Sequence, residues 1–239
     1  MNIEEIEAQN KKKYNEEFAK EYRKNDEAKL KNKDFNHYCS ILKEMSSSFN
    51  HKITILDLGC GTGTYFHCLE NIEKLVAVDV SPSMLEMAHN PVNAGEVKTQ
   101  NIEYICSNFF KNAFSNESFD FIYSVGVLGE LSPLEIDFLN KIYNWLRPGG
   151  KLYFTVMDIK NQPKESLYRR LLNYAYQKYM RFIKRKKVVV IQKVKKYPLS
   201  ETELKRIFEK TNFKTYSISF YQSPKNEWKG AHYEVFAEK

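Results

Sequence analysis

The stretch Ile53-Thr54-Ile55-Leu56-Asp57-Leu58-Gly59-Cys60-Gly61-Thr62-Gly63 decides the fold of this chain of 239 residues. It begins with a β-favouring apolar run and ends in a loop with glycine at every second position. The residues that follow, 64–72, are compatible with a helix. The stretch therefore predicts a strand, a tight turn and a helix that open a βαβ unit. Glycines let the backbone approach a ligand where a Cβ atom would clash, and the N–H groups of such a loop favour polar or anionic ligand groups.

A second apolar run, residues 74–79, ends on an acid about twenty residues beyond the first loop glycine. An acid at this distance meets the ribose hydroxyls of a bound nucleoside, because an adjacent parallel strand ends beside the ligand. Ser81 and Pro82 then supply an N-cap and a first helical residue for a helix over 83–89. Ser132-Pro133 opens a further helix, and Ser200 with Glu203 three residues on predicts a capped one. Five more strands are predicted at 101–107, 119–124, 151–157, 214–221 and 231–237.

The glycine loop differs from the dinucleotide-binding fingerprint, which has a third glycine where this chain has Thr64. With Asp57 ahead of Gly-x-Gly-x-Gly, it resembles motif I of the class I S-adenosylmethionine (SAM)-dependent methyltransferases. Four further segments resemble that family in the same order: Asp79-Val-Ser-Pro-Ser-Met84, Ser107-Asn-Phe109, Phe119-Asp120 and Arg147-Pro-Gly-Gly150. The motifs cover roughly residues 50–157, and residues 198–239 match only in the order of their elements.

The resemblance implies an α/β fold with a seven-stranded, mostly parallel sheet of order 3-2-1-4-5-7-6, its last strand antiparallel, and helices on both faces. It also implies SAM as the cofactor and S-adenosylhomocysteine as its product. Residues 1–49 are expected to form an N-terminal helical lid, and residues 50–239 the SAM-binding domain. A basic amphipathic helix is expected inside an insertion at about 160–197.

Carried over to this sequence, the resemblance sets the backbone of Gly59, Cys60 and Gly61 against the methionine part of SAM. Asp57 then orients its amino group, and Asp79 holds its ribose diol. Asn108 stands where the family often has an acid, and its amide is expected at the adenine amino group. The remaining cofactor-binding residues implied are Gly63, Val80, Met84, Phe109, Ser124 and Val125. For Val80 and Phe109 a plain core role fits equally well.

Glu130 is the candidate catalytic base, since it follows the fourth strand where many small-molecule members have a histidine. A solvent-facing acid before a helix is the alternative. Tyr14 and Tyr22 belong to a pattern similar to the N-terminal lid of such enzymes, and surface contacts of a helix explain them equally well. The transfer itself is an in-line displacement at carbon, so a base is optional.

No metal site is expected from the histidines or cysteines. His37, His51, His67, His89 and His232 lack metal-ligand spacing, and the four cysteines form no Cys-x-x-Cys pair. Reduced cysteines packed as small apolar residues are expected. With no long apolar run and no signal-peptide layout at the N-terminus, the sequence predicts a cytoplasmic protein.

The net charge of +7 is local. Residues 160–197 contain 13 Lys or Arg and a single acid, and the rest of the chain has more acids than bases. This segment indicates an anionic partner or a solvated face.

The leading hypothesis is methyl transfer to an oxygen or nitrogen of a small, anionic acceptor. One alternative is an RNA methyltransferase that binds RNA through residues 160–197. Another is a SAM-binding module without catalysis, held at an acidic membrane surface or on a partner by the same segment. The motif typical of amino-methylating DNA and protein-glutamine enzymes, Asp/Asn-Pro-Pro-aromatic, and the Pro-Cys pair of cytosine C5 enzymes are absent from the sequence.

Overall fold

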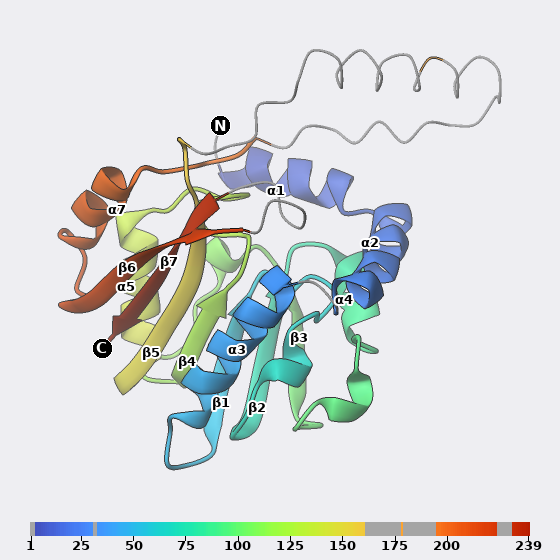
Figure 1. The fold of residues 1–239 in the computed structure, drawn as a ribbon, viewed down its shortest axis with the longest axis horizontal. Helices are drawn as coiled ribbons and strands as arrows, with labels where there is room; N and C mark the ends of the chain where they lie inside the picture. Colours follow the sequence, from blue (N-terminus) through green and yellow to red (C-terminus); the bar gives the residue numbers. More distant parts are fainter. Residues whose placement is uncertain (1–2, 31–32, 161–177, 179–194, 224–230) are drawn as a thin grey trace.

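The computed structural model describes residues 3–30, 33–160, 178, 195–223 and 231–239. Within these residues one seven-stranded sheet forms in the order β3-β2-β1-β4-β5-β7-β6 (Figure 1). The strands are β1 (Ile53–Leu58), β2 (Ile72–Asp79), β3 (Ile102–Cys106), β4 (Phe119–Ser124), β5 (Leu146–Met157), β6 (Thr215–Gln222) and β7 (Ala231–Glu238). The helices are α1 (Ile3–Lys13), α2 (Glu16–Lys29), α3 (Lys33–Ser47), α4 (Pro82–Ala88), α5 (Ile136–Trp145) and α7 (Glu201–Phe208), with short 3-10 turns η1 (Phe66–Cys68), η2 (Ala94–Glu96) and η3 (Phe109–Lys111).

The pairing of the strands confirms the predicted fold class. β1 through β5 pair in parallel, whereas β7 runs antiparallel to both β5 and β6. Parallel neighbours need crossover connections, which explains why the helices alternate with the strands along the first two thirds of the chain.

Two apolar cores cover the two faces of the sheet. Successive side chains of a strand point to opposite faces. Leu56 and Leu58 of β1 therefore join the core under α5 and α7, whereas Ile53 and Ile55 join the core under α3. Figure 1 shows α3 in front of the sheet and α5 behind it. Asp57 shares the α3 side with Ile55, so its carboxyl group is enclosed rather than solvated.

Local hydrogen bonds fix the helix starts that the sequence predicts. The Ser81 hydroxyl accepts from the backbone N–H of Met84 with Pro82 at the first turn, and Ser200 and Glu203 form the reciprocal capping box of α7. The predicted helix after Ser132 starts later, at Ile136, because residues 127–132 form a tight turn in which three backbone N–H groups bond to the carbonyl of Val127.

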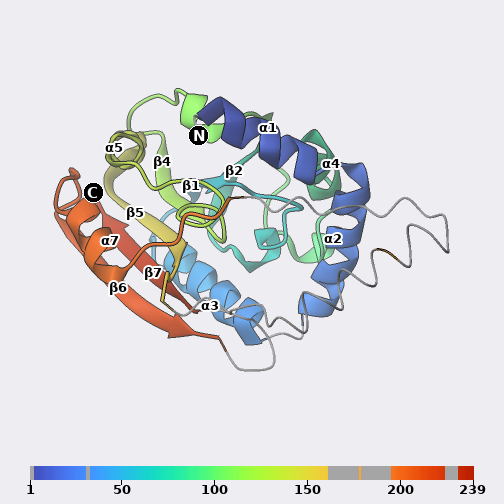
Figure 2. The same cartoon turned by 90° about the horizontal axis from the view of Figure 1, so that it is seen from above.

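The N-terminal segment is helical and lies at the carboxyl end of the parallel strands. In both views α1 and α2 curve over this end of the sheet (Figure 1, Figure 2). Arg23 of α2 donates to the carbonyl of Asn90, just beyond α4. The division into a lid at residues 1–49 and a domain at 50–239 stays a prediction.

The helix predicted over residues 64–72 is wrong. These residues form only the 3-10 turn η1, and β2 begins already at Ile72. The physical reason is that α3 already covers this part of the sheet. Ser46 of α3 accepts a hydrogen bond from the N–H of Glu70, and Asn71 turns the chain at φ 54° straight into β2.

The basic amphipathic helix expected in the insertion at about 160–197 falls almost wholly outside the described residues. Among the described helices, none is long and apolar enough to cross a membrane.

Candidate cofactor and acceptor site

A cavity of about 530 Å³ lies where the parallel strands end. Its floor comes from the ends of β1 and β2 and the glycine loop, and its sides from the loops after β3 and β4. Residues of α1, α2 and α3 close it from the other side. Ligands of open α/β sheets bind at this edge, where the strand order reverses, here between β1 and β4.

The glycine loop needs its glycines for two different reasons. Gly59, Gly61 and Gly63 all have φ in the left-handed region, at 84°, 55° and 73°. Gly59 and Gly61 line the cavity, and a Cβ at Gly59 would lie 2.5 Å from Cγ2 of Val127. Gly63 is not among the lining residues. A Cβ there would meet the ring of Phe66 at 2.7 Å, so its role in the structure is packing.

Gly59→Ala is expected to weaken cofactor binding by about ten-fold or more and to lower stability by about 1–2 kcal/mol. The left-handed backbone strains any Cβ, and the added methyl also forces the cavity-lining Val127 to shift. Calorimetric titration with S-adenosylhomocysteine and urea unfolding measure the two effects. Gly149→Ala is the control, since it has φ 75° and open space around its Cβ position. Equal binding losses in the two variants would contradict the assignment.

Asp57 is buried at the floor of the cavity. The hydroxyl of Tyr123 donates to its Oδ2 at 2.6 Å. Burial raises the pKa of Asp57 to about 8, the Tyr123 hydrogen bond opposes this rise, and the nearby charge of Asp79 adds to it. A cationic ligand group beside Asp57 would shift this carboxyl group towards its ionised form.

Asp79 ties the glycine loop to the start of α4. Its Oδ2 accepts from the N–H of Gly61 at 2.9 Å, and its Oδ1 accepts from the N–H of Ser81 at 2.8 Å. Burial raises the pKa of Asp79, and these backbone hydrogen bonds act in the opposite direction. Each carboxylate oxygen retains a further lone pair for a ligand hydroxyl.

Four residues predicted to bind the cofactor, Val80, Met84, Asn108 and Phe109, all line the cavity. The Asn108 side chain caps η3 by accepting from the N–H of Phe110, and it donates to Glu7 of α1 at 3.4 Å. Glu7 also pairs with Lys11 and Lys111, and these contacts lower its pKa to about 2. The amide of Asn108 is thus already engaged, and its role at the adenine edge stays a prediction.

The tyrosines of the predicted lid both line the cavity. Tyr14 and Tyr22 flank Phe18, with ring centroids 5.1 and 5.8 Å from it. The carbonyl of Tyr14 accepts from the hydroxyl of Ser81, which links the lid to the cap of α4. Burial raises the pKa of Tyr14, so its hydroxyl group stays neutral.

Glu130 lines the cavity beside two lysines. Its Oε1 lies 3.0 Å from Nζ of Lys196. Lys13 of α1 also lines the cavity, where burial lowers its pKa, and the charge of Lys196 lowers it further while that of Glu130 raises it. Lys13 and Lys196 are therefore both close to Glu130 in the lining of the cavity.

Comparison with known proteins identifies the domain that carries this cavity. Residues 55–150 match the methyltransferase domain family. The chain contains a class I SAM-dependent methyltransferase domain. It is 28% identical over 121 residues to a malonyl-[acyl-carrier protein] O-methyltransferase of Marinomonas sp., which is 49% of this chain and 43% of that protein. A similar enzyme of Priestia megaterium is 29% identical over 119 residues, 48% of this chain and 41% of that protein. The chain thus spans less than half the length of these curated relatives.

Solved structures share the fold of this methyltransferase domain. A SAM-dependent methyltransferase from Aquifex aeolicus superimposes with a TM-score of 0.59 at 19% identity, over 94% of this chain and 98% of that one. A phosphoethanolamine N-methyltransferase from Haemonchus contortus, solved with phosphomonomethylethanolamine and S-adenosylhomocysteine, gives a TM-score of 0.57 at 16% identity. It is matched over 84% of this chain and 52% of that one.

The residues around the cavity fit the cofactor of a methyltransferase. The glycine loop leaves a space that a Cβ at Gly59 would disturb, and the enclosed carboxyl group of Asp57 suits an ammonium group. The Oδ1 atom of Asn10 is buried and has no hydrogen-bond partner among the described residues. Since Asn10 lines the same cavity, it offers a further acceptor to a ligand.

Two of the predicted cofactor residues lie outside the lining of the cavity. They are Gly63 and Ser124. The hydroxyl of Ser124 donates to the carbonyl of Leu58 at 2.7 Å and so joins β4 to β1. Val125, the next residue, does line the cavity. Of the two predicted residues at this strand end, the structure thus brings Val125 to the cavity.

Sequence reasoning missed several lining residues, foremost Lys13, Lys196, Phe35, Tyr38 and Tyr65. Lys196 lies within the basic insertion, so charge clustering gave a signal for it. Lys13 follows Lys11 and Lys12 in the sequence, and only its partial burial in the folded structure distinguishes it from these exposed neighbours. The RNA and membrane alternatives, which depend on residues 160–197, gain no support from the described part of the chain.

Proposed function

We propose that this methyltransferase transfers the methyl group of SAM to an oxygen or nitrogen of a small anionic acceptor, with a carboxylate oxygen as the favoured atom. The proximity of Lys13 and Lys196 in the cavity lining carries the proposal. Around Glu130 two ammonium groups lie near one carboxylate, so this part of the cavity has a local excess of positive charge, which an anionic acceptor would neutralise. The curated relatives that methylate malonyl-[acyl-carrier protein] support a carboxylate acceptor.

A carboxylate acceptor needs no catalytic base, which agrees with the engagement of Glu130 in an ion pair with Lys196. A carboxylate is already deprotonated at neutral pH, so it attacks the methyl carbon without a base while the sulfonium leaves as a neutral thioether. Glu130 is held by Lys196 and would be needed as a base only for a neutral amine or hydroxyl acceptor. In this proposal the chain aligns the acceptor and methyl group and excludes water, with Tyr14 and Tyr22 above them.

Radiolabelled methyl transfer from SAM tests the proposal. Malonyl-[acyl-carrier protein] and phosphoethanolamine are the first acceptors, and mild alkali distinguishes the products because it hydrolyses methyl esters but not N-methyl groups. Alkali-labile label on a carboxylate acceptor is expected. Transfer to neutral acceptors only, or none to any anionic acceptor despite bound cofactor, would rule the proposal out.

Lys13→Met is expected to raise KM for an anionic acceptor about ten-fold while the affinity for S-adenosylhomocysteine stays unchanged. A hydrogen bond to a charged group contributes about 1.5–3 kcal/mol to binding. In the variant, Lys196 would still contact the acceptor and limit the loss. Steady-state kinetics and calorimetric titration check the two halves. Lys12→Met is the matched control because Lys12 is the neighbouring, exposed residue of α1. Equal KM values for the two variants would place the acceptor elsewhere.

A further inference from the structure

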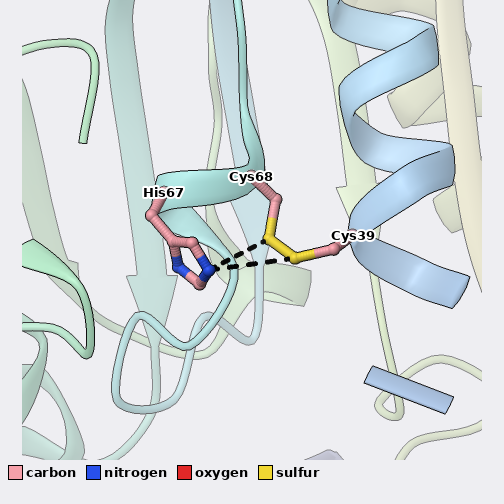
Figure 3. Close-up of side chains that lie close together, drawn as sticks. All are labelled: Cys39, His67 and Cys68. Carbon is pink, nitrogen blue, oxygen red and sulfur yellow. Dashed lines mark hydrogen bonds between the residues drawn. A yellow bond between two sulfur atoms is a disulfide. The ribbon is translucent and has the colours of Figure 1, made fainter. Parts of the chain in front are cut away.

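Three soft donor atoms meet where α3 packs on the turn after the glycine loop. Cys39 comes from α3, and His67 and Cys68 come from η1 (Figure 3). Nε2 of His67 lies 3.6 Å from Sγ of Cys68 and 4.0 Å from Sγ of Cys39. In the structure the two sulfurs form a disulfide, which contradicts the expected reduced, singly packed cysteines. They are 29 residues apart in sequence, and only the packing of α3 on η1 brings their Cα atoms to 5.1 Å.

This cluster is separate from the cofactor cavity, since none of its three residues lines that cavity. Residues that line the cavity nevertheless pack against the cluster and fix its position. The ring of Phe35, which lies one turn before Cys39, stacks on the rings of both Tyr65 and His67, with centroids 5.4 and 5.8 Å away. Cys68 is buried, whereas Cys39 and His67 are partly exposed. Two of the three residues are therefore partly accessible to solvent, and none of the three is part of the cavity lining.

The imidazole is oriented towards the sulfurs. Its Nδ1 atom is buried and has no hydrogen-bond partner among the described residues. Its Nε2 atom faces both sulfurs, as the dashed lines in Figure 3 show. A disulfide needs only the two cysteines, and its sulfurs are weak acceptors that gain little from an imidazole. A third donor converging on the same point is the arrangement that a metal ion requires.

We propose that the reduced chain binds a thiophilic divalent ion of the Zn²⁺ class through Cys39 Sγ, Cys68 Sγ and His67 Nε2. The three donor atoms lie within 4.8 Å of one another. With Zn–S bonds of about 2.3 Å and Zn–N bonds of about 2.0 Å, tetrahedral geometry separates ligand atoms by roughly 3.5 Å. The two sulfur-to-nitrogen distances of 3.6 and 4.0 Å are close to that separation. Three protein ligands leave a fourth position for water.

Metal binding requires that the disulfide between Cys39 and Cys68 is first reduced. A thiol reductant supplies two electrons and two protons that convert the disulfide into two thiols. The metal ion then displaces both thiol protons and takes the Nε2 lone pair of a neutral imidazole. The bound ion and the disulfide are thus alternative links between α3 and the segment that follows the glycine loop.

Co²⁺ titration of the full-length chain tests the site, because thiolate ligands give Co²⁺ a charge-transfer band in the near ultraviolet and tetrahedral sites give strong visible bands. The chain is first reduced with a phosphine, which competes little for the ion, and kept free of oxygen. One equivalent of Co²⁺ is expected to bind with thiolate bands, and Zn²⁺ should displace it. The protein before reduction should show no such bands.

Cys39→Ser and Cys68→Ser are each expected to abolish the thiolate bands, and His67→Ala to weaken binding about ten-fold or more. Cys106→Ser is the matched control, since Cys106 is an exposed free cysteine on β3. Circular dichroism and S-adenosylhomocysteine binding report whether each variant is folded. Reduced wild-type chain without thiolate bands, or bands that survive in folded Cys39→Ser and Cys68→Ser variants, would overturn the proposal and leave a disulfide only.

Discussion

Asp79→Ala is expected to lower the affinity for S-adenosylhomocysteine about 100-fold or more. Asp79 is the acid at the end of β2, where the ribose hydroxyls are predicted to bind, and two hydrogen bonds to a charged acceptor contribute about 3 kcal/mol together. The substitution also removes the acceptor of the Gly61 and Ser81 N–H groups, so the glycine loop loses its link to α4. Calorimetric titration measures the affinity, and thermal unfolding measures how much stability is lost with the hydrogen bonds to Gly61 and Ser81.

Asp79→Asn separates these two effects. Its amide oxygen keeps one acceptor for the backbone while the charge is lost, so stability should fall less than in Asp79→Ala and the affinity should still fall about ten-fold. The hypothesis of a ribose contact fails if both variants bind S-adenosylhomocysteine as tightly as the wild-type chain does.

Asp57→Asn is expected to make the ligand-free protein more stable at pH 8 and to flatten the dependence of its stability on pH. The folded-state pKa of Asp57 is about 8, well above the value of about 3.9 for an unfolded chain. Between these two values the folded protein keeps a proton that the unfolded chain has released. Raising the pH through this window therefore destabilises the wild-type fold, by about 1.4 kcal/mol per pH unit at most.

Urea unfolding at pH 6, 7 and 8 in the absence of ligand measures this effect as the difference between the variant and the wild-type chain. The asparagine can still accept the Tyr123 hydroxyl group, so the comparison isolates the charge. The same variant should bind S-adenosylhomocysteine about ten-fold more weakly, because an ammonium group beside residue 57 would lose its counter-charge.

Asp120→Asn serves as the control for the pH dependence. Burial alone would raise the pKa of Asp120, but the N–H of Thr54 and the guanidinium of Arg147 outweigh it and lower that pKa. The carboxyl group of Asp120 is ionised in both the folded and the unfolded chain over this range. In a His51→Gln background, which removes the imidazole that lies 3.3 Å from Oδ1, its substitution should therefore lower stability by a constant amount. A pH-independent difference for Asp57→Asn as well would show that Asp57 is ionised in the ligand-free fold.

The sequence alone determined the sheet and the floor of the cavity. Buried parallel strands appear as continuous apolar runs, and Asp79 closes such a run at the edge where ligands bind, whereas Asp57 was singled out by the family resemblance. Gly59 and Gly61 could be predicted because a close backbone approach leaves no alternative residue. The caps at Ser81 and Ser200 are local hydrogen-bond patterns, which depend on neighbours three residues away.

Tertiary structure decided everything that depends on contacts between distant segments. The sequence around Thr64 is compatible with a helix, yet α3 occupies the space, and the chain turns directly into β2. Lys13 lies near Lys196, and Cys39 meets His67 and Cys68, only because α1 and α3 fold back over the sheet. Spacing along the chain carries information about one element and its turns. Partners separated by tens of residues are set by how whole elements pack, which no local pattern encodes.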